Sequence, residues 1–312
     1  MRMTFKNKIS GSACIAIGVF DGVHVGHRRI VAELRAMADR MNCHAVAVSF
    51  MPHPRMVVAP ESAPRLLVSP ERRVELLMEA GADDAVLLPF TLELSRLSPS
   101  EFLDSIFNAD DFALRGIVVG SAWRFGHRAA GGCAELAGFC SAHGVDFCPV
   151  AEVVTDGAVV SSSRIRTLVA TGRLADADRL LGRPAELSGY VAGGLKLAGS
   201  RLAHPTANVM VEYGILPPDG VYAAALRAED GAWRPAALNI GTTPTVREYG
   251  GDGSRRVEAH VLDYSGDLYG KKVTIKLIKF MREERCFGSL DELKKQIEVD
   301  VTQIKAVVSG EK

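Results

Sequence analysis

Residues 18–27 read GVFDGVHVGH and connect an apolar run at residues 13–20 to a stretch with helical spacing. The apolar run predicts a buried strand, and the spacing of Ile30, Leu34 and Met37 predicts a helix with one apolar face. The glycines of the string allow a sharp turn and a close approach of the backbone to a ligand. The stretch therefore predicts a strand–turn–helix unit, the first part of a βαβ fold.

Three further apolar runs follow in the first half, at residues 45–50, 85–89 and 116–120. They are short and apolar on both faces, as parallel strands buried in a sheet are. Between them, Ser98-Pro99-Ser100-Glu101 is typical of a helix start: serine caps the first turn, proline fits its first position, and the glutamate completes a capping box. This alternation predicts a Rossmann-like parallel sheet with helices.

The second half carries six strand-like runs separated by turns rich in glycine, proline and aspartate. The runs are residues 187–192, 207–211, 221–227, 236–240, 257–264 and 273–281. Several short strands with such turns predict an antiparallel barrel or sandwich. A closing helix follows, capped by Ser289 with Glu292 as the partner in a capping box. Its apolar stripe is Leu290, Leu293, Ile297, Val301 and Ile304.

The pattern changes near Gly182-Arg183-Pro184, so we expect a first domain of residues 1–183 and a second of residues 184–312. The 37 basic residues balance the 37 acidic ones, and nothing global favours nucleic acid or an anionic membrane as a partner. Six cysteines without a C-x-x-C pair favour reduced thiols in a cytoplasmic protein. We expect no secretory signal and no membrane span.

Residues 18–27 also predict an anion site. A helix that begins after Gly26 directs free N–H groups and the positive end of its dipole at the turn. His24 and His27 add two imidazoles three residues apart. These groups together suit a polyphosphate, whereas a lone H-x-x-H pair more often caps a helix.

The same string matches the HxGH signature of nucleotidyltransferases. In the form GxFDGxHxGH it resembles the adenylyltransferase half of bacterial bifunctional riboflavin kinase/FAD synthetases. Three later segments resemble that family in its order: residues 49–54 (SFMPHP), 120–126 (GSAWRFG) and 160–166 (VSSSRIR). The resemblance implies a nucleotidyltransferase domain that joins FMN and ATP into FAD and pyrophosphate.

The resemblance also implies roles for particular residues. His24 and His27 would steady the ATP phosphates as catalytic residues, with Arg166 on the departing pyrophosphate and Mg²⁺ or another divalent cation accompanying ATP. The implied ATP-binding residues are Gly18, Phe20, Asp21, Gly22, His24, Gly26, His27, Ser162, Arg164 and Arg166. The implied pocket for flavin and nucleotide includes His53, Pro54, Arg124, Phe125 and Gly126.

The second half resembles the riboflavin kinases. Residues 205–208 read PTAN, and Arg282 and Phe287 match the arginine and phenylalanine before the family's last helix. Four more segments match in family order: residues 181–184 (LGRP), 220–223 (GVYA), 239–245 (NIGTTPT) and 257–260 (VEAH). The resemblance implies an antiparallel barrel with a C-terminal helix that phosphorylates riboflavin to FMN with ATP.

In this resemblance Glu258 is the general base for the riboflavin hydroxyl, and Thr206 and Asn208 bind Mg²⁺. Asn239, Gly241 and Arg282 belong to the pocket for flavin and ATP. Strand alternation alone gives Glu258 a simpler reading as an outward side chain, with Val257 and Ala259 on the opposite face.

Some positions depart from the family's pattern. In the first half, Ala122, Ala129 and Gly132 replace two acidic residues and a basic one, and Ala203 and His204 replace a glycine and an aromatic residue in the second. These departures leave open a riboflavin kinase with a weakened or inactive adenylyltransferase domain. A flavin- or nucleotide-binding regulator without turnover, and an adenylyltransferase with another acceptor, are remoter alternatives. All of them take small-molecule ligands.

Overall fold

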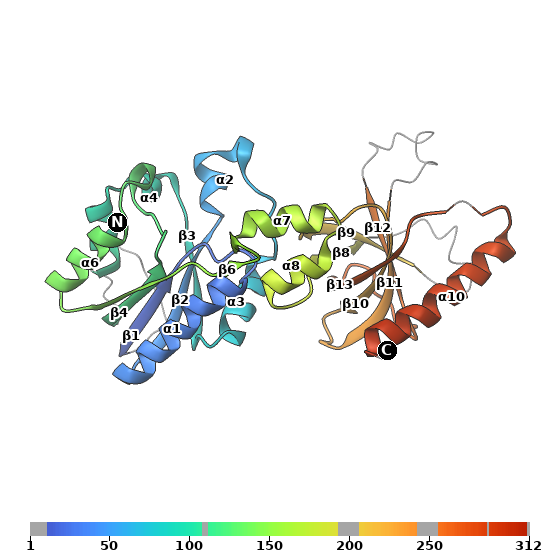
Figure 1. Cartoon of the computed structure of the whole chain (residues 1–312), viewed down its shortest axis with the longest axis horizontal. Helices are drawn as coiled ribbons and strands as arrows, with labels where there is room; N and C mark the ends of the chain where they lie inside the picture. Colours follow the sequence, from blue (N-terminus) through green and yellow to red (C-terminus); the bar gives the residue numbers. More distant parts are fainter. Residues whose placement is uncertain (1–10, 108–111, 193–205, 242–254, 286, 311–312) are drawn as a thin grey trace. The chain divides into compact units, whose positions relative to one another are not determined.

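The computed structural model describes residues 11–107, 112–192, 206–241, 255–285 and 287–310. The chain divides into two compact units (Figure 1): Met1–Pro64 with Pro70–Ser162, and Arg65–Ser69 with Ser163–Lys312. Each unit has its own sheet. The boundary expected at residue 183 separates the domains to which we assign the two activities, and it stays a prediction.

The first unit is built on a five-stranded parallel sheet of order β3-β2-β1-β4-β5. Its strands are β1 (Ser12–Ile17), β2 (His44–Met51), β3 (Asp84–Pro89), β4 (Ala113–Gly120) and β5 (Asp146–Val150). Its helices are α1 (Val25–Met41), α2 (Pro54–Val58), α3 (Pro70–Glu79), α4 (Leu92–Arg96), α5 (Pro99–Phe107) and α6 (Cys133–Ala142), with short 3-10 turns η1 (Pro60–Ser62) and η2 (His127–Ala129). A small hairpin, β6 (Val154–Thr155) and β7 (Ala158–Val159), follows the sheet.

β1 occupies the middle of this sheet, and all of its residues after Ser12 are buried. Ile15 and Ile17 join a core formed with neighbouring strands and with helices α5 and α6. On β4, Gly116 allows α1 to pack closely, since a Cβ at this position would stand 2.3 Å from the Met37 sulfur. The strand order reverses at β1, between β2 and β4, and parallel sheets bind ligands beyond the strand ends at such a reversal.

The second unit is a closed six-stranded barrel of order β10-β11-β12-β9-β8-β13. Its strands are β8 (Glu186–Ala192), β9 (Ala207–Tyr213), β10 (Gly220–Arg227), β11 (Trp233–Gly241), β12 (Arg256–Val261) and β13 (Lys272–Arg282). Helices α7 (Ser162–Ala170) and α8 (Leu174–Leu181) precede the barrel, and α10 (Leu290–Ser309) follows it. α10 packs on β10, β11 and β13 (Figure 1), where its Ile304 is fully buried with Ala223.

These elements confirm the predicted fold, including the antiparallel barrel that the resemblance implied. Four details of the prediction were wrong. β1 stops at Ile17 rather than at residue 20, because the loop begins there. β12 stops at Val261 rather than at residue 264, because Asp263 turns into the left-handed region with φ 55°. α1 begins at Val25, before Gly26, because His24 caps it. Ser289 caps α10 as predicted, because its hydroxyl accepts from the Glu292 N–H at 3.2 Å, but the Glu292 carboxylate accepts from the Gly288 N–H at 3.0 Å, one residue before the expected partner.

β5 was not predicted from the sequence. Its residues read DFCPV, and the proline at position 149 argues against a strand when only the sequence is considered. Pro149 donates no backbone hydrogen bond, which an edge strand tolerates. Within the described residues, no helix is long and apolar enough to cross a membrane.

Candidate active sites

The loop after β1 is held to β2 by main-chain and side-chain hydrogen bonds. The Gly18 N–H donates to the Val48 carbonyl at 3.1 Å, and the Ser49 hydroxyl donates to the Val19 carbonyl at 2.8 Å. Further along the loop, the Ser162 hydroxyl donates to the Asp21 carbonyl at 2.9 Å. These bonds hold the loop in one shape at the C-terminal edge of the sheet.

That shape includes two unfavourable backbone conformations. Phe20 has φ 50° and Val23 has φ 39°, in the left-handed region that costs a non-glycine residue about 1–3 kcal/mol. The Val23 N–H donates to the Phe20 carbonyl at 3.1 Å and closes the turn between them. Gly18 is required beside it, because a Cβ there would stand 2.9 Å from the Phe20 ring.

The two histidines of the loop stack on each other at the start of α1. Their ring centroids are 3.6 Å apart with an interplanar angle of 17°. The His27 N–H donates to Nδ1 of His24 at 3.3 Å, so a neutral His24 carries its proton on Nε2. Gly26 is close to this ring, since a Cβ there would stand 3.2 Å from it.

His27 is held in its neutral form. Burial lowers the pKa of His27 well below its ordinary value, and the neighbouring His24 and the positive charge of Arg73 lower the pKa further. Its Nδ1 atom is buried and has no hydrogen-bond partner among the described residues. A buried ring nitrogen of this kind, at the positive end of a helix dipole, fits a site that receives an anionic ligand.

The segment after β2 ends at the same edge of the sheet. His53 is 8% exposed and its Nδ1 accepts from the Arg55 N–H at 3.1 Å, which caps α2. Pro54 occupies the first position of that helix. The residues implied by the resemblance thus follow β1 and β2, neighbouring strands of one sheet.

The segment after β4 reaches this edge as well. Arg124 donates from Nε to the Ala129 carbonyl at 3.0 Å and from Nη2 to the Ala130 carbonyl at 3.1 Å. A Cβ at Gly132 would stand 2.8 Å from Nη1 of Arg124, so the missing side chain gives the guanidinium its space. Phe125 is buried and stacks on Trp123, with ring centroids 4.8 Å apart.

Arg73 on α3 lies beneath the loop, and no motif pointed to it. Its side chain is fully buried, and its Nη1 donates to the Val19 carbonyl at 3.3 Å, the Ser49 hydroxyl at 3.1 Å and the Phe50 carbonyl at 3.0 Å. The available signal was its helical spacing: Arg73 shares a face with the buried Leu76 and Leu77. An arginine on an apolar helix face is rarely buried without partners.

Two residues of the first set fall in the second unit. Arg164 and Arg166 lie on α7, and Nε of Arg166 donates to the Arg65 carbonyl at 2.8 Å. Ser162, at the start of the same helix, belongs to the first unit through its bond to Asp21.

The second candidate site lies on the outer face of the barrel. Glu258 on β12 pairs with Asn208 on β9 and with Asn239 on β11. The flanking Val257 and Ala259 are buried in the interior, whereas Glu258 is half-buried. Directly paired residues bring their side chains within about 5 Å of each other, so two amides flank one carboxylate.

Thr206 stands two residues before Asn208 and is exposed. A hydroxyl and an amide oxygen beside a carboxylate are the kind of oxygen donors that Mg²⁺ takes in proteins while it keeps waters and phosphate oxygens. Pro205, Ala203, His204 and residues 242–245 of the NIGTTPT segment lie outside the described residues.

The segment after β13 contacts this face. Nδ2 of Asn239 donates to a Glu284 carboxylate oxygen at 2.9 Å. Gly241 provides the space, because a Cβ there would stand 2.2 Å from the same carboxylate. The amide of Asn239 is therefore oriented by Glu284.

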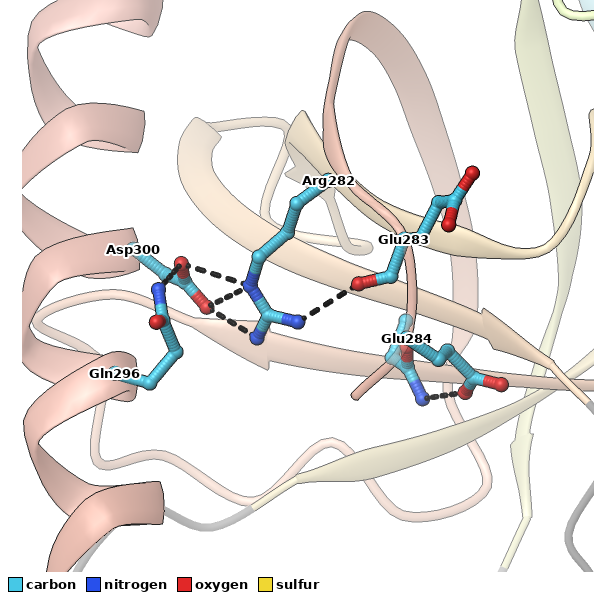
Figure 2. A network of polar contacts seen from close by, with 6 residues as sticks. Arg282, Glu283, Glu284, Gln296 and Asp300 are labelled. Carbon is cyan, nitrogen blue, oxygen red and sulfur yellow. Dashed lines mark hydrogen bonds and ion pairs between the residues drawn. The ribbon is translucent and has the colours of Figure 1, made fainter. Parts of the chain in front are cut away.

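Arg282 is bound to α10 (Figure 2). Its Nε and Nη2 donate to the Asp300 carboxylate at 3.1 and 2.7 Å, and its Nη1 donates to the Glu283 carbonyl at 3.0 Å. Gln296 on the same helix donates to Asp300 at 2.9 Å. The guanidinium that the resemblance implied for the pocket thus anchors the end of β13 to α10.

Comparisons with known proteins match both halves. A family model of FAD synthetase matches residues 6–164, and one of riboflavin kinase matches residues 181–308. The bifunctional riboflavin kinase/FMN adenylyltransferase of Pseudomonas fluorescens is 37% identical over 299 residues, which cover 95% of this chain and 93% of the relative. The chain belongs to the bifunctional riboflavin kinase/FMN adenylyltransferase family.

Other relatives agree with the family assignment. A protein of the same name from Escherichia coli K12 is 32% identical over 286 residues, covering 92% of this chain and 90% of the relative. A crystal structure titled as a macrolide-efflux protein from Streptococcus pneumoniae has a TM-score of 0.80 and covers 97% of this chain and 98% of its own. At 24% identity it shows a common fold and nothing more.

As a member of the riboflavin kinase/FMN adenylyltransferase family, the chain is a transferase with a FAD synthetase domain followed by a riboflavin kinase domain. Its substrates are accordingly small molecules: ATP, riboflavin and FMN. The predicted order of the two activities along the chain is confirmed.

Proposed function

We propose that this enzyme runs two reactions in sequence at separate sites. In the second domain, residues 184–312, the γ-phosphoryl group of ATP passes to the riboflavin 5′-hydroxyl and gives FMN and ADP. In the first, residues 1–183, a phosphate oxygen of FMN attacks the α-phosphorus of a second ATP and gives FAD and pyrophosphate. The observation that carries the proposal is that the His24–His27 pair and the Asn208–Glu258 pair lie in different compact units.

The adenylyl transfer needs positioning and charge stabilisation rather than a protein nucleophile. His24 and His27 are hydrogen-bonding groups at the start of α1, where the helix dipole favours the phosphates of ATP. The lowered pKa of His27 supports this role, because a neutral imidazole can form a hydrogen bond without adding a buried positive charge near that of Arg73. Ser162, Arg164 and Arg166 complete the proposed ATP-binding set, with Arg166 on the pyrophosphate.

The kinase reaction needs a base for the hydroxyl proton. Glu258 accepts that proton while the hydroxyl oxygen bonds to the γ-phosphorus and the bond to the bridging oxygen of ADP breaks. Thr206 and Asn208 would hold Mg²⁺, which neutralises phosphate charge when it is bound. Asn239, whose amide donates to Glu284, is the second amide beside the proposed base.

One observation favours a second candidate function, riboflavin kinase with a weakened adenylyltransferase. The resemblance implies an acidic residue at position 132, and here glycine offers Arg124 no carboxylate, while the guanidinium donates to the main-chain carbonyls of Ala129 and Ala130. Ala122 and Ala129 are exposed and offer no charge to a nucleotide. Fewer charged groups at this edge predict weaker binding of FMN or ATP.

A chromatographic time course separates the two. Purified protein receives ATP, Mg²⁺ and either riboflavin or FMN. FAD in both tubes supports two working sites. FMN that accumulates in the first tube, with no FAD in the second, supports the kinase alone. The reduced thiols of the described cysteines suit a cytoplasmic enzyme, and fractionation of the source cells tests this proposal.

A further inference from the structure

We infer that Arg73 is a positioning residue of the adenylyltransferase site. One nitrogen of its guanidinium binds the backbone of two segments at once: the loop after β1, through Val19, and the end of β2, through Phe50. The inference rests on the proposed location of that site.

The two segments carry different parts of the proposed site. Val19 stands in the string that leads to His24 and His27, and Phe50 stands three residues before His53. Ser49 is bonded both to Arg73 and to the Val19 carbonyl, so the three groups form one closed set. A shift of this set would move the histidine pair relative to His53.

The loop needs such a support. It carries two non-glycine residues, Phe20 and Val23, in the left-handed region, and this conformation persists only where the surroundings hold it. α3 supplies the donor, Arg73, which follows Val19 by 54 residues in the sequence. Arg73 is fully buried, so its contacts are shielded from water.

The charge of Arg73 also acts on the site. It is one of the causes that keep the pKa of His27 low, after burial and the neighbouring His24. A buried cation behind the loop adds positive potential where a polyphosphate would lie, and burial strengthens this effect because little water screens it. Position and charge thus act in the same direction.

Arg72 provides a matched control on the same helix. Its guanidinium pairs at 2.8 Å with both Glu75 and Glu79 on α3. It is 7% exposed, so it is buried like Arg73, and these two ion pairs lie within its own helix. Arg72→Met therefore removes a buried arginine of α3 without removing the bridge to Val19 and Phe50.

The test uses the full chain with Arg73→Met, Arg73→Lys and Arg72→Met. For FAD formation from FMN and ATP, we expect Arg73→Met to lower kcat/KM for ATP by about 10- to 100-fold, because displacement of reacting groups by about 1 Å has such effects. Arg73→Lys should recover most of the loss, since it keeps a cation and three donors. Arg72→Met should stay within about twofold of the parent.

Riboflavin phosphorylation by the same preparations is the internal reference, because its proposed site lies in the other unit. It should stay within about twofold in all three variants, by the same reasoning that distant sites act independently. Proton NMR of the His27 imidazole, assigned through its loss in His27→Ala, should show a raised pKa in Arg73→Met. A residue that served stability alone would lower both activities together and leave that titration unchanged.

FAD formation at the parental rate in folded Arg73→Met would overturn the inference, as would an equal loss of both activities with no recovery in Arg73→Lys. If Arg73→Met does not fold, Arg73→Gln decides: a raised KM for ATP in FAD formation with unchanged riboflavin phosphorylation supports the inference, and a parental KM refutes it. A parent chain that makes FMN but no FAD would instead refute the adenylyltransferase function itself, and the inference with it.

Discussion

Glu258 and Asn208 stand directly opposite each other in the antiparallel register of β12 and β9, on the outer face of a closed barrel. Val257 and Ala259 are buried, whereas Glu258 between them is half-buried and lies on the outer face. The two residues come from segments about 50 positions apart, so only strand pairing places an amide beside the proposed base.

Glu258→Gln is expected to abolish FMN formation from riboflavin, by about 100-fold or more, since an amide cannot accept the hydroxyl proton. FAD formation from supplied FMN should remain within about twofold, because its site lies in the other unit. Steady-state assays with each flavin measure both. Glu212→Gln is the control: this exposed carboxylate shares the outer face of β9 with Asn208. Equal effects of the two substitutions would contradict the role of Glu258.

His27→Ala is expected to produce the reverse result. It removes the ring that stacks on His24 and the buried Nδ1 atom, so FAD formation should fall by about 100-fold while FMN formation persists. His44→Ala is the control, because His44 is exposed and begins β2 at the opposite edge of the sheet. Loss of both activities in folded His27→Ala protein would argue against two separate sites.

Asp300→Asn is expected to destabilise the second unit by about 2–3 kcal/mol, because it leaves the mostly buried Arg282 guanidinium without its carboxylate. Chemical denaturation, followed by a probe in the barrel such as Trp233, measures the loss. Asp263→Asn offers a comparison, since Asp263 also joins the barrel to α10 through Lys305 but at the surface. That change should cost less than about 1 kcal/mol. Similar losses in the two variants would show that the Arg282–Asp300 pair contributes no more to the free energy of unfolding than a surface ion pair.

Asp178 predicts a pH dependence of stability. Burial raises the pKa of Asp178 from 3.8 to about 6, although its carboxylate accepts from the Ala185 N–H at 2.9 Å. Because the folded state binds this proton more tightly than the unfolded state, its contribution is complete below pH 3.8 and is lost as the pH rises towards 6. Asp178→Asn should remove this pH dependence of the unfolding free energy. The change amounts to no more than about 2 kcal/mol, because the group is partly exposed.

Thermal unfolding between pH 4 and pH 7 checks the Asp178 prediction, and Asp178→Asn should be at least as stable as the parent at about pH 7. Asp176→Asn is the contrasting variant. Because Arg173 lowers the pKa of Asp176, removal of this carboxylate should leave the dependence of stability on pH between pH 4 and pH 7 as it is in the parent. A parental slope in Asp178→Asn would mean that another group controls it.

Local pattern was enough to predict much of this protein. The apolar run of β1, the helical spacing of α1 and the Ser98–Glu101 capping box each depend on neighbours in sequence, and the structure confirms them: the Ser98 N–H donates to Glu101 at 2.8 Å and the Glu101 N–H donates to the Ser98 hydroxyl at 3.3 Å. β5 escaped prediction because it contains Pro149, which only an edge strand tolerates, and its place at the edge is set by the assembled sheet.

The sequence by itself determined both domain types, the order of the two activities and the stretches of chain that carry them, because strand and helix periodicities and contiguous motifs are written in consecutive residues. Tertiary structure alone decided that Glu258 meets Asn208. It also decided that Asp300 holds Arg282 and that Arg73 bridges Val19 and Phe50. The physical reason is that these contacts join segments far apart in the chain, and a buried donor acquires its acceptors only when packing brings them together.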